Sequence, residues 1–111
     1  MLYTATASMR IRAILVWGAL PSLLSAQVAI TGRVVDETGA GVDGARVELR
    51  AASGTTAAAS SDRAGNFRVN LPTAGEYTIR AERLGFYLYQ GKPREFETGP
   101  NELSVTLNHV Q

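Results

Sequence analysis

The chain of 111 residues contains no cysteine and only one histidine, His109. Without cysteine it has no thiol nucleophile, no cysteine-based zinc or iron–sulfur site and no disulfide framework. It also lacks an excess of one charge, because 11 lysines and arginines stand against 10 acidic residues. A nucleic-acid-binding protein needs a marked positive surplus, so this balance argues against DNA or RNA as a partner.

One long apolar run lies near the N-terminus and predicts a secretory signal peptide over residues 1–26. Arg10 and Arg12 precede the run, and Leu24 and Ala26 fit a peptidase site that cleaves before Gln27. The alternative is an uncleaved membrane anchor, but a spanning helix needs about 20 apolar residues and this run is shorter. We therefore expect an exported protein, in the periplasm or at the cell outer membrane, with one domain over residues 27–111.

The rest of the chain alternates apolar and polar residues, and no stretch has the 3.6-residue apolar spacing of an amphipathic helix. Short strands separated by turns rich in glycine, asparagine and aspartate are typical of two packed sheets. The segment 53–61 has few large apolar residues, which favours an edge strand. The pattern predicts an all-β fold, a seven-stranded Greek-key β-sandwich.

A single core is expected between the two sheets. The strands before residue 82 supply most of it, the segment 84–89 is apolar on both faces, and residues 99–101 are expected to turn into the last strand. The residues expected to be buried are Val28, Ile30, Val34, Val47, Leu49, Phe67, Val69, Leu71, Tyr77, Ile79, Leu84, Phe86, Leu103, Val105 and Leu107.

Several motifs follow one another in a characteristic order. They are Ile30–Gly39 (ITGRVVDETG), Gly44–Leu49 (GARVEL), Asp62–Phe67 (DRAGNF), Leu71–Ile79 (LPTAGEYTI) and Leu84–Phe86 (LGF). Together they resemble the carboxypeptidase regulatory-like domain. The resemblance implies a transthyretin-like (prealbumin-like) sandwich, related to starch-binding-like folds, that has no peptidase activity of its own. A signal peptide followed by this domain is similar to the N-terminus of bacterial TonB-dependent outer-membrane receptors.

The residues that carry the resemblance have structural chemistry. Asp62 can accept backbone N–H bonds across its turn, and Gly65 can adopt a positive φ. The aromatic rings of the motifs are suited to fill the core. The residues interpreted as turn or core residues are Asp62, Gly65, Phe67, Gly75, Tyr77 and Gly85.

No constellation of residues points to catalysis or to a cofactor. His109 lies three residues from the end and is poorly placed for a nucleophilic triad. Asp36, Glu37 and Asp43 match no EF-hand spacing, and turn formation is the simpler account of them. The glycines at 39 and 41 are not followed by a helix that could receive a dinucleotide phosphate. We therefore expect neither a bound metal nor a cofactor, and a protein that is not an enzyme.

Tyr87 and Tyr89 are the candidate contact residues, with Phe86 and Leu88 expected to point inward. Exposed aromatic rings can stack on sugars or anchor a protein partner, although rings here can also cover the open end of the sandwich. The leading hypothesis is a binding or spacer module of a receptor, whose partners are a downstream plug and barrel. The alternatives are a carbohydrate-binding module and an exported accessory to an enzyme.

Overall fold

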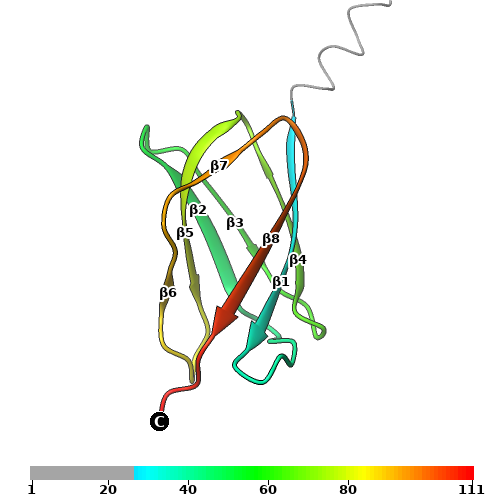
Figure 1. Ribbon diagram of the computed structural model, residues 1–111, viewed down its shortest axis with the longest axis vertical. Coiled ribbons are helices and arrows are strands. Elements are labelled where there is room, and N and C mark those ends of the chain that lie inside the picture. The colour runs from blue at the N-terminus through cyan, green and yellow to red at the C-terminus, as the bar shows by residue number, and fades with distance from the viewer. Residues whose placement is uncertain (1–26) are drawn as a thin grey trace, which may run out of the picture.

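The computed structural model describes residues 27–111, so the signal peptide predicted for residues 1–26 lies outside the described residues. Two sheets pack face to face, and the all-β sandwich expected from the alternation is confirmed (Figure 1). The strands are β1 (Val28–Asp36), β2 (Arg46–Ala51), β3 (Thr56–Ser60), β4 (Asn66–Leu71), β5 (Gly75–Glu82), β6 (Tyr89–Gln90), β7 (Arg94–Phe96) and β8 (Gly99–Leu107).

One sheet has the order β4-β1-β8, and the other has the order β3-β2-β5-β6, with β7 also paired to β5. The chain crosses from one sheet to the other after β1, β3, β4 and β7, so both sheets share one core. β1 pairs antiparallel with β4 and parallel with β8. In residues 27–111 no helix is long and apolar enough to span a membrane.

The core follows the alternation of the strands. Its buried hydrophobic residues are Val28, Ile30, Val34, Val42, Ala45, Val47, Leu49, Phe67, Val69, Leu71, Tyr77, Ile79, Ala81, Phe96, Leu103, Val105 and Leu107. The expectation for Leu84 is wrong, because its side chain is 89% exposed. β5 ends at Glu82, and a turn closed by the Phe86 N–H on the Arg83 carbonyl carries Leu84 outward.

The expected turn at residues 99–101 is also wrong, since these residues begin β8. The chain bends earlier, where the Asn101 side chain accepts from the Glu97 N–H and donates to the Glu97 carbonyl. Pro100 is tolerated because it lies near the start of an edge strand, where a missing N–H costs no ladder bond.

The structure has one strand more than the seven expected, because the outer edge of the larger sheet is divided. β6 pairs with the end of β5 through Arg80↔Gln90 and Ala81↔Tyr89, whereas β7 pairs with its beginning. Residues 91–93 lie between the two short strands and belong to neither. At the opposite edge is β3, whose residues are all alanine, serine or threonine.

Candidate functional site

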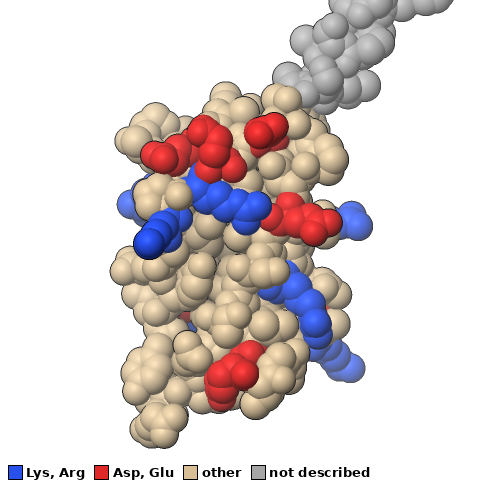
Figure 2. All heavy atoms as spheres, in the orientation of Figure 1, with Lys and Arg blue, Asp and Glu red and all other residues tan. Residues whose placement is uncertain are grey.

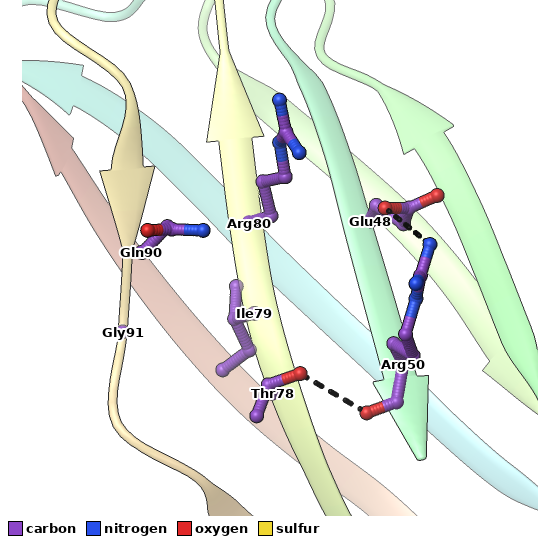
Figure 3. A pocket seen from close by; sticks show the side chains of 7 residues that line it. All are labelled: Glu48, Arg50, Thr78, Ile79, Arg80, Gln90 and Gly91. Atoms are coloured by element: carbon purple, nitrogen blue, oxygen red, sulfur yellow. Dashed lines mark hydrogen bonds and ion pairs between the residues drawn. The ribbon is translucent and has the colours of Figure 1, made fainter. Parts of the chain in front are cut away.

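A polar depression lies on the outer face of the five-stranded sheet, where its edge is divided (Figure 3). It encloses about 370 Å³. It is lined by Glu48 and Arg50 of β2, Thr78, Ile79 and Arg80 of β5, Gln90 of β6, and Gly91, the residue that follows β6. We refer to this surface as the polar depression.

Strand register brings its side chains together. Arg80 lies directly opposite Glu48 on one side and opposite Gln90 on the other, so three polar side chains cross the sheet in one row. Gly91 is the next residue along the chain, and its N–H donates to the Ile79 carbonyl at 2.9 Å. A Cβ atom on Gly91 would lie 2.9 Å from the Tyr89 hydroxyl, so the position where a side chain at residue 91 would lie is already filled by Tyr89.

The charged groups of the polar depression are paired only loosely. A Glu48 carboxylate oxygen lies 3.7 Å from Arg50 Nη2 and the other lies 3.8 Å from Arg46 Nη2. Arg80 Nη2 lies 3.7 Å from Glu82 Oε2. Charge-assisted hydrogen bonds are about 2.7–2.9 Å long, so these guanidinium groups keep donors for another acceptor. The Glu48 side chain is 23% exposed, whereas that of Arg50 is 61% exposed.

The uncharged groups add further hydrogen-bonding capacity. The Thr78 hydroxyl donates to the Arg50 carbonyl at 3.2 Å, which leaves its oxygen able to accept. Within residues 27–111, the Gln90 side-chain amide has no hydrogen-bond partner. The polar depression therefore offers donors and acceptors side by side, and it holds no nucleophile with an adjacent base.

A second group, which we call the C-terminal cluster, consists of Glu37, Phe86 and His109. The Glu37 carboxylate accepts from the His109 backbone N–H at 3.0 Å and from His109 Nδ1 at 2.7 Å. The rings of Phe86 and His109 have centroids 4.1 Å apart. Hydrogen bonds from the Tyr87 N–H to the Asn108 carbonyl and from the Val110 N–H to the Gly85 carbonyl extend this contact.

Hydrogen bonding also lowers the pKa values of two carboxyl groups at this end of the molecule, Glu37 and Asp36. The bond from the His109 side chain is the main reason that the pKa of Glu37 lies below its ordinary value. The neighbouring Asp36 accepts from the Thr38 hydroxyl and backbone and from the Ala40 N–H. These bonds, led by the Thr38 hydroxyl, lower the pKa of Asp36. Residues 27–111 contain no group of acids and histidines arranged to hold a metal ion.

The two candidate tyrosines do not share an exposed face. Tyr87 is 54% exposed, whereas Tyr89 is partly buried and packs against the core. Tyr89 points inward because it pairs with Ala81, which is fully buried. Leu88, expected to point inward, is 46% exposed because it lies before β6 begins. The structure thus leaves one exposed ring, Tyr87, instead of a platform of two.

Asp62, Gly65 and Gly85 lie at turns, whereas Gly75 is the first residue of β5. Asp62 Oδ1 accepts from the Ala64 and Asn66 N–H groups, each at 2.9 Å. Gly65 has a φ of 88°, in the left-handed region that glycine adopts without strain. Gly75 and Gly85 also have positive φ.

The two motif aromatics lie in the core. Phe67 is 4% exposed and Tyr77 is 1% exposed. The Tyr77 hydroxyl donates to the Thr73 carbonyl at 2.9 Å, and its ring meets that of Phe96 edge to face. Their contacts are structural and do not reach the polar depression.

Glu48, Arg50, Arg80 and Gln90 were not among the site residues expected from the sequence. Alternation places the first three on the outer face of their strands, and this was the available signal. Their proximity depends on the pairing of β2 with β5 and of β5 with β6, which one strand's pattern does not contain. On the face drawn in Figure 2, acidic and basic side chains are interspersed.

Comparison with known proteins places this sandwich among recognised domains. The family model described as the carboxypeptidase regulatory-like domain matches residues 29–108. No curated protein matches the chain in sequence.

Three solved structures show the same fold. A candidate carbohydrate-binding protein from Bacteroides uniformis is 25% identical, with a TM-score of 0.60 over 71% of this chain and 40% of that one. The minor pilin GBS52 of Streptococcus agalactiae is 15% identical, with a TM-score of 0.64 over 78% and 46%. A chlorocatechol 1,2-dioxygenase from Pseudomonas putida is 12% identical, with a TM-score of 0.59 over 76% and 61%. This chain thus covers less than two thirds of the length of each of these three proteins.

Proposed function

Because the chain belongs to the carboxypeptidase regulatory-like domain family, we propose that it is a non-catalytic, exported β-sandwich that acts by contact, as a binding or spacer module. In the more specific form of the proposal, it is the N-terminal periplasmic domain of a TonB-dependent outer-membrane receptor involved in transport. Its partners are then the plug and barrel of that receptor, and it meets the outer membrane only through them.

The parallel pairing of the first and last strands is the observation that carries the spacer role. β1 and β8 run side by side in register from Val28↔Gly99 to Asp36↔Leu107. The chain therefore enters the sandwich at one end and leaves it at the other (Figure 1). Nine residues of extended chain cover about 30 Å, so the domain holds the segments on its two sides apart by that length.

The C-terminal cluster supports the same role. A spacer fixes the position of the next segment only if the chain that leaves the domain is held against it. The Glu37 carboxylate and the Phe86 ring hold His109, two residues beyond the end of β8. The direction in which the chain leaves the domain is thereby defined by contacts of the sandwich.

Export is tested by expressing the full chain with a C-terminal tag in a Gram-negative host. We expect a mature protein that begins at Gln27 and fractionates with the periplasm or the outer membrane. The Ile14→Asp variant, which breaks the apolar run of the signal, should stay in the cytoplasm unprocessed. Unprocessed wild-type protein in the cytoplasm would contradict the proposal.

The receptor context is tested by reading the gene beyond the codon for Gln111. A plug and an outer-membrane barrel in the same frame are expected. A stop codon at that position would refute the proposal that the domain belongs to a receptor. The protein would then be a stand-alone exported module, for example an accessory to an enzyme.

Carbohydrate binding is a second candidate function, favoured by the likeness to the candidate carbohydrate-binding protein of Bacteroides uniformis. That likeness extends over 71% of this chain. The polar depression supplies a surface on which such binding can be tested.

A further inference from the structure

We infer that the polar depression binds a neutral, polyhydroxylated ligand of the size of a sugar ring, through hydrogen bonds from its outer-face side chains. The inference rests on the second candidate function and assigns it to Glu48, Arg50, Arg80 and Gln90 instead of to Tyr87 and Tyr89.

The arrangement of charge selects the class of ligand. The Glu48 carboxylate lies between the guanidinium groups of Arg46 and Arg50, at 3.8 and 3.7 Å. Arg80, whose guanidinium pairs with Glu82, is the partner of Glu48 across β5. A small anion drawn to the arginines would meet the carboxylate, and a cation drawn to the carboxylate would meet the arginines. A neutral hydroxyl group can donate to Glu48 while it accepts from Arg50 or Arg80, so it suits both.

The side chains of the polar depression retain the hydrogen-bonding capacity that a polyhydroxylated ligand needs. The ion pairs of Glu48 with Arg50 and of Arg80 with Glu82 are both 3.7 Å long. At that length they are weak contacts, made by three exposed groups and the partly exposed Glu48, and they cost little to rearrange. The Gln90 amide, unpaired within residues 27–111, adds both a donor and an acceptor beside Arg80.

The shape of the surface fits a ring lying flat on the sheet. A volume of about 370 Å³ is within the range of small-molecule sites. Beside the charged row, the lining is completed by Thr78, Ile79 and Gly91. The lining contains no aromatic ring, because Tyr89 packs inward against the core. Binding without aromatic stacking should be weak, with dissociation constants in the millimolar range.

The test is an NMR titration of the full chain, purified as the host processes it, with neutral trisaccharides of glucose, xylose and N-acetylglucosamine. We expect saturable shifts of the backbone amides of residues 48–50, 78–80 and 90–91 with at least one of these sugars. Sodium sulfate, titrated in parallel, should produce no saturable shift at these amides.

Two variants test the assignment. Glu48→Gln removes a charged hydrogen-bond acceptor and should weaken binding by about tenfold or more, and Gln90→Ala should weaken it in the same direction. Asn70→Ala, which removes an exposed amide from β4 on the other sheet, should leave the affinity unchanged.

The outcomes separate this inference from the function on which it rests. Sugar-induced shifts confined to Tyr87 and its neighbours would overturn the site but keep carbohydrate binding. No shift with any sugar would overturn both, and saturable binding of sulfate alone would replace a neutral ligand with an anion. None of these results affects the test of export.

Discussion

Gly32 lies in β1 directly opposite Phe67 of β4, at an inward-facing position of the strand. A Cβ atom there would overlap the Phe67 ring and lie 2.5 Å from the Leu103 carbonyl oxygen. The Phe67 ring therefore occupies the space that a side chain at residue 32 would fill. At the scale of single residues, the packing of the core depends on a glycine in β1 that leaves room for a large ring from β4.

Gly32→Ala should lower the free energy of unfolding by about 1–3 kcal/mol, because overpacking forces the ring and the backbone of β8 to shift. Urea unfolding followed by circular dichroism measures the change. Ser104→Ala, at an exposed position of β8, should change it by no more than about 0.5 kcal/mol. Equal stability of Gly32→Ala and wild type would show that the Phe67 ring does not occupy this space in solution.

The contact of Glu37 with His109 should weaken in acid. The pKa of Glu37 is lower in the folded protein than its ordinary value of 4.5, so the contact is fully present above pH 4.5. It is lost as the pH falls through the lowered pKa and the carboxylate becomes protonated. Hydrogen exchange of the Val110 N–H, which bonds to the Gly85 carbonyl, should therefore accelerate beyond its intrinsic pH dependence below pH 4.5.

Glu37→Gln provides the comparison, because it keeps the shape of the side chain without the titrating group. Its Val110 N–H should be weakly protected at every pH, without the additional change in acid. A wild-type protection factor that stays constant from neutral pH to about pH 3 would disprove the role of this carboxylate.

At the scale of elements, the divided edge of the larger sheet contributes to two places. β6 supplies Gln90 to the polar depression, and β7 supplies Phe96 to the core. β7 has only three residues, but its Phe96 is 1% exposed and meets the Tyr77 ring edge to face, with centroids 6.2 Å apart. Arg94 of the same strand lies over the Phe96 ring and donates to the Glu102 carbonyl of β8. This short strand closes the space between the two sheets.

Phe96→Ala should reduce the free energy of unfolding by about 3–5 kcal/mol, as other deletions of buried aromatic rings do. Chemical denaturation measures the loss, and Glu97→Ala, the exposed neighbour, should be close to wild type. If the alanine variant does not fold, Phe96→Leu should fold with a loss of about 1.5 kcal/mol or less. A loss for Phe96→Ala no larger than that for Glu97→Ala would contradict the role of β7.

At the scale of the whole molecule, the parallel arrangement of β1 and β8 separates the two ends of the domain. The three-stranded sheet has β1 at its centre, hydrogen-bonded to both β4 and β8. A load applied at the two ends would therefore act along strands that are held over their full length. This arrangement matches a module that separates its neighbours.

Spin labels at Ala29→Cys and Gln111→Cys can measure this separation, and the absence of native cysteine makes the labelling specific. Pulsed electron paramagnetic resonance should give a single narrow distance of about 30 Å. Glu37→Gln should broaden the distribution by releasing the C-terminal segment, whereas Glu102→Gln, an exposed acid on β8, should not. A broad distribution in the wild-type protein would refute a defined exit.

Local chemistry accounts for much of what was predicted correctly from the sequence. Side chains alternate across a strand whatever its neighbours are, so the buried positions of β2, β4 and β5 could be predicted from the chain. The predictions were wrong where the two-residue alternation of apolar and polar side chains is interrupted. Leu84 and Leu88 are as apolar as core residues, but the turn after β5 carries them outward, whereas Phe96 lies in a strand too short for a pattern to appear.

The polar depression depends on information that no single strand contains. Glu48 and Gln90 are far apart in the sequence, and only the pairing of β2, β5 and β6 places them in one row with Arg80. Composition and alternation were enough to indicate the two-sheet sandwich and most of its turns, although not the start of β8 at Gly99, because backbone geometry acts over a few residues. Register, the division of the sheet edge and the contact between Glu37 and His109 arise from long-range packing, which only the folded chain specifies.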